Sequence, residues 1–145
     1  MSTINQYLSD DHKACDDLFA ATAFSAAKDW PGARDQFDAF TASMRRHFAR
    51  EEEVLFPAFE ARTGMSGGPT FVMRSEHQQI NHLLAEMRSA LERADDAAYL
   101  GQSETLLMLM RQHNMKEENI LYPMADQALA DESDTLVARM EPIQA

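Results

Sequence analysis

Residues 47–57 read HFAREEEVLFP and residues 113–123 read HNMKEENILYP, so one phrase occurs twice in the chain, 66 residues apart. Each copy begins with a histidine and carries a glutamate four residues later. On an α-helix these two side chains lie on the same face, one turn apart. A fainter repeat relates SDDH at residues 9–12 to RSEH at residues 74–77. The sequence therefore predicts two similar helical hairpins, each with a lone histidine and a His-x-x-x-Glu pair.

Apolar residues recur at helical spacing along four long stretches. These stretches run from about Thr3 to Ala27, from Phe37 to Phe59, from Met73 to Leu91 and from Leu106 to Ala128. Turn or loop signals separate them: Trp30-Pro31-Gly32 within residues 28–34, the glycine-rich residues 63–69, and the capping aspartates of residues 94–96. Because short connections join antiparallel neighbours, the predicted fold is all-α, an antiparallel up-down-up-down four-helix bundle. Residues past Asp134 allow a short C-terminal helix, and residues 1–145 are expected to form a single domain.

The composition excludes several kinds of partner. The chain has 145 residues and a formal net charge of −11, which disfavours nucleic acid because phosphate binding needs clustered Lys and Arg. No apolar run approaches the roughly 20 residues that span a bilayer, and residues 1–13 lack the pattern of a signal peptide. The single cysteine, Cys15, has no partner for an intrachain disulfide, which fits a reducing compartment. We expect a cytoplasmic protein that binds neither nucleic acid nor membrane.

Four histidines fall at one level of the predicted bundle. In each hairpin the lone histidine and the paired histidine lie about equally far from the turn, roughly 20 Å at about 1.5 Å per residue. The glutamate of each pair falls on an apolar stripe without Lys or Arg, and a buried carboxylate without a cation is strongly disfavoured. A metal ion is the simplest partner, and imidazole with carboxylate suits iron, zinc or manganese. The predicted metal ligands are His12, His47, Glu51, His77, His113 and Glu117.

The other candidate residues are interpreted as supporting or structural. His82 lies five residues after His77, off the inward face, and is expected at the surface. Asn81 is expected to face inward and to hydrogen-bond near the metal, and Cys15 is expected to be a small core residue. The acids expected at the solvent or at the seam between helices are Glu52, Glu53 and Glu118. No P-loop, His-Glu-x-x-His motif or aligned nucleophile is present, so no catalytic residue is assigned.

The doubled His-x-x-x-Glu-Glu-x-x-Leu-aromatic-Pro phrase resembles the hemerythrin family, and specifically its His-His-Glu cation-binding domains. The resemblance covers residues 12–123 and implies a non-haem di-iron centre, with or without an oxo or hydroxo bridge. It implies that the bridging carboxylates belong to Glu51 and Glu117, that His12 and His47 bind one iron, and that His77 and His113 bind the other. Oxygen-carrying hemerythrins have a further histidine where this chain has Asn81. The symmetric site with four histidines and two glutamates resembles iron-sensing and iron-centre-repair relatives instead.

These features favour a binding protein over an enzyme. We expect it to bind or sense a small diatomic ligand or a peroxide, namely O₂, NO or peroxide, at the di-iron site. Two alternatives remain open at this point: a di-iron enzyme for iron-centre repair or peroxide reduction, and a module that buffers iron, zinc or manganese. The sequence indicates no protein partner.

Overall fold

The computed structural model describes residues 3–25 and 30–144, and within these ranges every regular element is helical. The predicted all-α class is confirmed. In chain order the elements are α1 (Ile4–Ser25), α2 (Trp30–Arg50), the π-helical turn η1 (Glu51–Leu55), α3 (Phe56–Thr63), α4 (Pro69–Glu92), α5 (Asp96–Lys116), the π-helical turn η2 (Glu117–Leu121), α6 (Tyr122–Ala128), the 3₁₀ turn η3 (Ala130–Glu132) and α7 (Ser133–Met140). None of these described helices has both the length and the apolar character needed to cross a bilayer.

The connections between the helices match the prediction in part. Residues 26–29, which include the expected end of the first helix at Ala27, lie outside the described residues. The turn expected over residues 28–34 is wrong from residue 30 onward, because α2 already begins at Trp30. Pro31 is no obstacle there, since the first turn of a helix needs no donor from its N–H groups. Asp95 caps α5 as expected, accepting a hydrogen bond from the backbone N–H of Ala98.

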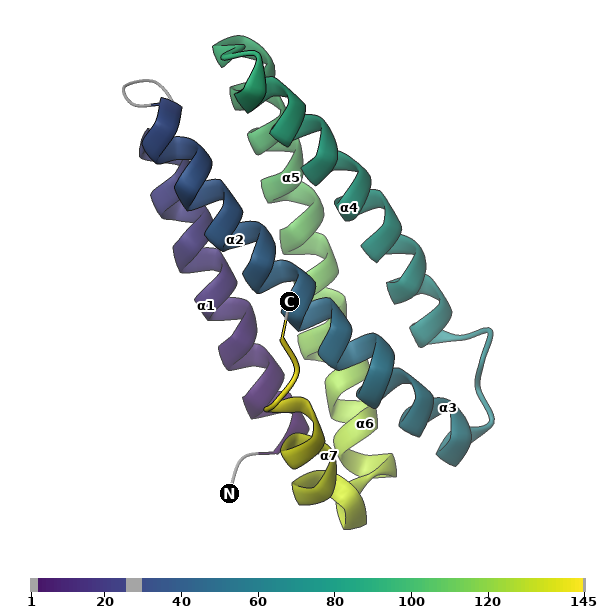
Figure 1. Ribbon diagram of the computed structural model, residues 1–145. Helices are drawn as coiled ribbons and strands as arrows, with labels where there is room; N and C mark the ends of the chain where they lie inside the picture. The colour runs from purple at the N-terminus through teal and green to yellow at the C-terminus, as the bar shows by residue number, and fades with distance from the viewer. Residues whose placement is uncertain (1–2, 26–29, 145) are drawn as a thin grey trace.

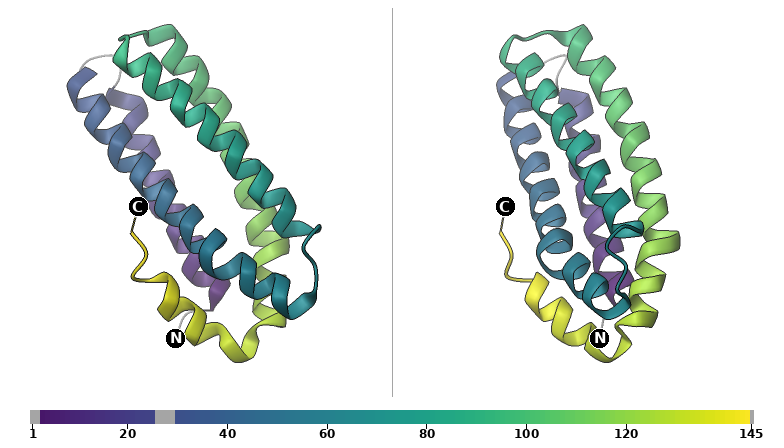
Figure 2. Two further views of the ribbon diagram at one scale, coloured as in Figure 1. Left: turned by 45° about the vertical axis from the view of Figure 1, so that its right-hand side comes forward. Right: turned by 90° about the vertical axis from the view of Figure 1, so that its right-hand side faces the viewer.

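The long helices pack as two pairs. α1 lies along α2, and α4 lies along α5, while α2 also contacts α4 (Figures 1 and 2). The expected C-terminal helix is present as α7, which packs on α1 and η1 and buries Leu136, Val137 and Met140. In Figure 1 it lies at the end of the molecule where the N-terminus also lies. The finer prediction, an up-down-up-down bundle, stays a prediction.

Two apolar clusters fill the interior, one at each end of the helices. The loop-end cluster consists of Cys15, Phe19, Ala33, Phe37, Phe40, Met44, Phe48, Ile80, Leu83, Leu84, Met87, Ala90, Leu91, Tyr99, Leu106 and Met110. The tail-end cluster consists of Ile4, Leu8, Val54, Leu55, Phe56, Phe59, Met73, Leu121, Tyr122, Ala125, Leu129, Leu136, Val137 and Met140. Burial of such apolar surface is the main favourable contribution to folding. Between the clusters lies a polar layer.

The second and fourth long helices each contain a π-helical turn, and both turns stand at the same place in the repeated phrase. The N–H of Phe56 donates to the carbonyl of Glu51, and the N–H of Tyr122 donates to that of Glu117. Pro57 and Pro123 follow directly, and each lacks the N–H that would continue the α-helical ladder. Each proline is thus accommodated where the i→i+4 pattern has already given way to wider bonding. π turns are rare and often mark functional sites.

Candidate metal centre

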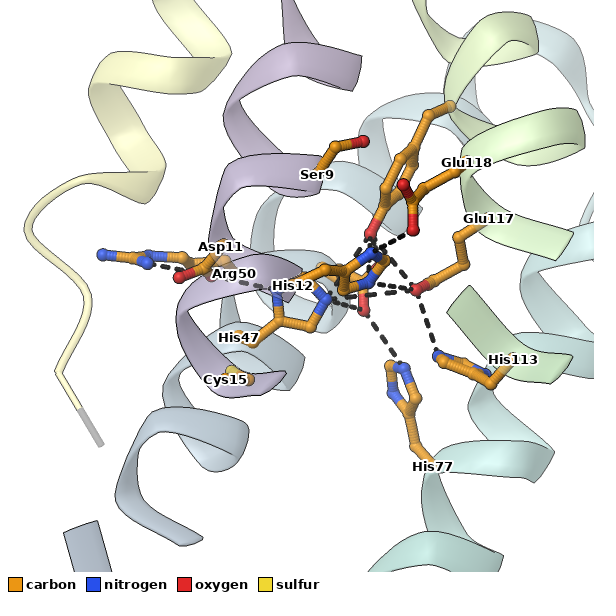
Figure 3. A network of polar contacts seen from close by, with 12 residues as sticks. Ser9, Asp11, His12, Cys15, His47, Arg50, His77, His113, Glu117 and Glu118 are labelled. Atoms are coloured by element: carbon orange, nitrogen blue, oxygen red, sulfur yellow. Dashed lines mark hydrogen bonds and ion pairs between the residues drawn. The ribbon is translucent and has the colours of Figure 1, made fainter. Parts of the chain in front are cut away.

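The six predicted ligands meet in the polar layer between the two apolar clusters, and none is more than 4% exposed. The lone histidines come from α1 and α4, and the other two from the last turns of α2 and α5. Each glutamate is the first residue of a π turn. Figure 3 shows the four histidines, each from a different long helix, pointing toward one another and toward Glu117. The structure therefore brings together every residue of the predicted set, and none is left outside it.

Each glutamate contacts histidines from both hairpins. The contacts between a histidine Nε2 and a glutamate Oε1 are His12–Glu117 at 2.9 Å, His77–Glu51 at 3.1 Å, His113–Glu117 at 3.1 Å and His47–Glu51 at 3.3 Å. One group of donors able to hold an ion comprises Glu51, His77, His113 and Glu117, and a second comprises His12, His47 and Glu117. Glu117 belongs to both groups, and Glu51 contacts a histidine of each, so both carboxylates lie between the two histidine pairs.

Several donor atoms in this layer make no hydrogen bond of regular geometry with the described residues, although three of them lie at ion-pair distance from a neighbour. They are Oε1 of Glu51, Nε2 of His77, Nε2 of His113 and Oε2 of Glu117, and all four are buried. A buried polar atom without a partner costs about 1–3 kcal/mol, so such atoms are rare in folded proteins. A cation at this position would satisfy all four at once. Nitrogen and oxygen donors suit iron, zinc or manganese, and the donor set therefore fits a metal ion.

The outer nitrogen of every histidine in the layer contacts a carboxylate. The Nδ1 contacts are His77–Glu52 at 2.6 Å, His113–Glu76 at 2.8 Å, His47–Asp11 at 2.9 Å and His12–Glu118 at 3.2 Å. Since a carboxylate only accepts hydrogen bonds, Nδ1 carries the proton in each pair. This arrangement orients the ring, points Nε2 inward and makes it a better metal ligand.

These four pairs form a closed circle, which we call the acid–histidine ring. The acid on α1 bonds the histidine of α2, the acid after α2 bonds the histidine of α4, the acid on α4 bonds that of α5, and the acid after α5 bonds that of α1. Sequence reasoning placed Glu52 and Glu118 at the solvent or the seam and missed this role. Their side chains are 39% and 42% exposed, yet their carboxylates reach inward. The sequence did hold a signal, because each acid of the ring is the direct neighbour of a predicted ligand. The four pairs are Asp11-His12, Glu51-Glu52, Glu76-His77 and Glu117-Glu118.

Two cations reinforce the ring at equivalent positions of the repeated phrase. Arg50 pairs with Asp11 at 3.0 Å, and Lys116 pairs with Glu76. Burial raises the pKa of the Asp11 carboxyl, but its bonds to His47 and Arg50 outweigh burial and lower that pKa below its ordinary value. Burial likewise raises the pKa of Glu76, and Lys116 and His113 reverse the effect. Both acids therefore stay charged when the histidines they hold are neutral or protonated.

The two glutamates also change the proton affinity of the histidines. Burial lowers the pKa of His77, but hydrogen bonds to Glu51 and Glu52 outweigh it and raise the pKa to about 9. For His47, burial again lowers the pKa, but the charge of Glu51 and the hydrogen bond to Asp11 outweigh burial and raise the pKa well above 6.5. Burial raises the pKa of Glu117, but hydrogen bonds and nearby histidines hold it well below its ordinary value. Without metal, protons on His47 and His77 balance the buried carboxylates.

Tyr122 is a member of the layer that sequence reasoning missed. Its hydroxyl, which has one proton to donate, lies 2.8 Å from the acceptor Glu51 Oε2 and 3.1 Å from the acceptor Glu117 Oε1. It also lies 3.1 Å from Nε2 of His12 and 3.4 Å from Nε2 of His47. Burial and the two carboxylates raise the pKa of the phenol well above its ordinary value. The sequence held one signal: the second copy of the phrase ends in Tyr-Pro where the first ends in Phe-Pro.

The remaining expectations divide into one error and three confirmations. Asn81 is exposed, so the prediction that it faces inward is wrong. The inward stripe of α4 advances from His77 to Ile80, which is 1% exposed, and Asn81 lies one residue past that face. His82 is at the surface, as expected, and it pairs with a glutamate one turn later, a contact that was not predicted. Cys15 is buried in the loop-end cluster, and Glu53 is exposed.

Comparison with known proteins places this geometry in context. The family model for the hemerythrin HHE cation-binding domain matches residues 3–125. Among curated proteins, the chain is similar to the iron-sulfur cluster repair protein YtfE of Yersinia pseudotuberculosis serotype IB (strain PB1/+) and of Yersinia pestis (strain Pestoides F). Each is 28% identical over 104 residues, which cover 65% of this chain and 47% of the relative. The chain thus spans about half the length of the curated relatives it matches. No solved structure matches significantly.

Proposed function

This chain belongs to the hemerythrin HHE cation-binding domain family, and on that premise we propose that it is a non-haem di-iron protein that binds a small ligand. One ion is held by His12 and His47 and the other by His77 and His113, with Glu51 and Glu117 between them. The observation that carries the proposal is the set of four buried, unpartnered donor atoms converging between two shared carboxylates. The family membership supports a cation at this site, and we propose that the cation is iron.

The residues of the chain supply the setting for that chemistry. Bound iron would supply coordination positions not taken by protein and a change between ferrous and ferric states. The acid–histidine ring fixes the ring orientation of each ligand, and the flanking apolar clusters keep bulk water from the layer. Tyr122 offers a hydroxyl donor inside the layer. We propose O₂, NO or peroxide as the ligand, because the layer is enclosed and a larger molecule would have to displace core side chains.

The test is metal analysis followed by ligand addition. We expect protein purified without added metal to contain iron approaching two ions per chain. The anaerobic di-ferrous protein should change its absorption spectrum when O₂ or NO is added, and an unchanged spectrum would rule out ligand binding. His113→Ala and Glu117→Ala should each lower the iron content, whereas His82→Ala, at an exposed position, should not. Full iron content in both ligand variants would overturn the site assignment.

A second candidate is a role in iron-centre repair, and the similarity to the YtfE proteins favours it. In that case the protein donates iron to a damaged cluster rather than reporting on a ligand. The test is iron transfer from the loaded protein to a cluster-depleted iron–sulfur protein in the presence of sulfide. Transfer must exceed that from an equal amount of ferrous salt with a competing chelator. If the two rates are equal, the repair role is excluded.

We further propose that the long helices form the up-down-up-down bundle that the sequence predicts. Three observations support it: α1 packs along α2, α4 packs along α5, and the four histidines lie at one level within the layer. Engineered cysteine pairs, one joining α1 to α2 and one joining α4 to α5 on either side of the layer, would test the helix directions by selective disulfide formation.

A further inference from the structure

The two copies of the repeated phrase differ in the aromatic residue that each places in the metal layer. Phe56 and Tyr122 occupy the same place in the two copies. The Phe56 ring lies beside His77, with 5.7 Å between ring centroids. The Tyr122 ring lies beside His12, with 5.5 Å between ring centroids, so each aromatic ring stacks on a histidine in the same way. The hydroxyl of Tyr122 is therefore the chemical difference between these two aromatic positions.

That hydroxyl lies against the histidine nitrogens of one half only, although it also bonds the two shared carboxylates. Nε2 of His12 and Nε2 of His47 lie 3.1 and 3.4 Å from the Tyr122 oxygen. The buried donor atoms without a hydrogen bond include Nε2 of both His77 and His113, and no histidine nitrogen of the first half. An ion entering between His77 and His113 thus meets nitrogens that have only their glutamate contacts to exchange. An ion entering between His12 and His47 must first displace the hydroxyl.

The approach to the two halves differs in one side chain. A groove of about 690 Å³ runs between α1 and α5 and reaches Glu118, the carboxylate that bonds His12. The equivalent groove between α2 and α4 consists of two adjoining parts of about 630 and 270 Å³, and only the smaller part reaches Glu52, the carboxylate that bonds His77. Phe48 lines that smaller part, and its ring covers His77, with 3.8 Å between the ring centroids. In the groove between α1 and α5 the repeat places Asn114 at this position.

We propose that the two halves have different tasks: the His77–His113 half holds a permanent ion, and the His12–His47 half holds an exchangeable one. This inference rests on the proposed dinuclear centre and adds to it an order of binding and a route. The permanent ion binds first, under the Phe48 ring. The exchangeable ion binds second and more weakly, because Tyr122 competes for its donors. It enters and leaves through the groove between α1 and α5, past Glu118.

The experiment is an anaerobic titration of the metal-free full-length chain with Fe(II), in competition with a chelator of known affinity. We expect two separate steps. A hydrogen bond to a charged group contributes about 1.5–3 kcal/mol, so the second step should be about ten- to a hundredfold weaker. His47→Ala should remove the weak step and keep the tight one, and His113→Ala should remove the tight step. Tyr122→Phe, which keeps the ring, should strengthen the second step relative to the first and so narrow the gap between the two steps, because only the second step also loses a competitor at its histidine nitrogens.

Two further variants use the other copy of the phrase as the matched control. Phe56→Tyr places a hydroxyl beside His77 and should weaken the first step. Asn114→Phe copies Phe48 into the open groove and should slow release of the second ion to a chelator without changing its equilibrium affinity. Two equal steps in the unaltered protein would overturn the inference while leaving the dinuclear centre intact. So would a weaker second step in Tyr122→Phe, since the hydroxyl would then be a ligand. Binding of no iron at all would instead overturn the proposed function.

Discussion

The polar layer and the two apolar clusters are built from the same helices, yet they obey opposite energetics. Along α1, Ile4 and Leu8 belong to the tail-end cluster, His12 to the layer, and Cys15 and Phe19 to the loop-end cluster. The other long helices cross the same three zones. In the clusters, burial stabilises the fold without any partner. In the layer, burial is unfavourable until protons or a cation balance two carboxylates. The comparison teaches that stability and metal binding are separable here, and it yields four predictions.

The largest effect is expected from removing the carboxylate shared by both donor groups. Glu117→Ala should abolish binding of both ions, because Glu117 is the one residue common to the two groups. Metal content of the purified variant would measure the loss of binding in the polar layer. A thermal melt of the same variant would measure the stability that the apolar clusters provide. The matched control is Glu53→Ala, since Glu53 is exposed in the same type of π turn. A variant that keeps two ions per chain would contradict the bridging role.

The converse experiment truncates an apolar cluster. Leu91 is 1% exposed in the loop-end cluster, and Leu91→Ala should lower the free energy of unfolding by about 2–5 kcal/mol through lost burial and a cavity. The metal content per folded chain should not change. Urea unfolding with parallel metal analysis tests this. If metal is lost in proportion to stability, cluster and layer are not separable.

Within the layer, the acid–histidine ring should affect affinity rather than folding. Asp11→Asn and Glu52→Gln each weaken the acceptor that orients a ligand, and loss of such partners typically costs about 10–100-fold in metal affinity. Asp11 should show the larger effect, because its side chain is 9% exposed and that of Glu52 is 39% exposed. Chelator competition measures the affinities. The absence of an effect in both variants would show that the histidines are oriented by packing alone, and equal losses would show that exposure does not set the contribution of each acid.

The smallest effect concerns pH and distinguishes the metal-free from the loaded protein. The pKa of His77 is raised from 6.5 to about 9, so its stabilising contribution is complete below pH 6.5 and is lost as the pH rises through about 9. The pKa of Glu117 is lowered, so its contribution is lost only as the pH falls in the acid range. Metal-free protein should therefore unfold more easily at pH 9 than at pH 6. Metal competes with these protons, so loaded protein should show no such loss. The test is to measure the free energy of unfolding of the metal-free and the loaded protein at both pH values. Equal stability of the metal-free protein at the two pH values would contradict the prediction.

The sequence predicted the inner ligands because a duplicated His-x-x-x-Glu phrase combines residue type with helical spacing. It did not reveal the outer shell, since Glu52 and Glu118 look like surface residues by helical position. Only the distance between neighbouring helices decides that their carboxylates reach a histidine. The prediction for Asn81 was wrong for a related reason. Buried residues on α4 follow His77 in alternating steps of three and four, beginning with a step of three to Ile80. Asn81, four residues after His77, therefore lies off the buried face. The π turns were not predicted, because the periodicity of apolar residues continues past both prolines.

Mechanically, the acid–histidine ring is a closed belt of contacts that links neighbouring helices around the long axis of the molecule. Each helix contributes an acid to the contact with one neighbour and a histidine to the contact with the other. A helix that slides by one turn, about 5.4 Å, breaks two of these contacts at once. Shear on any one helix is therefore shared with both neighbours. The four contacts together fix the position of each helix along this axis. The ligand side chains are therefore at matching heights before an ion binds.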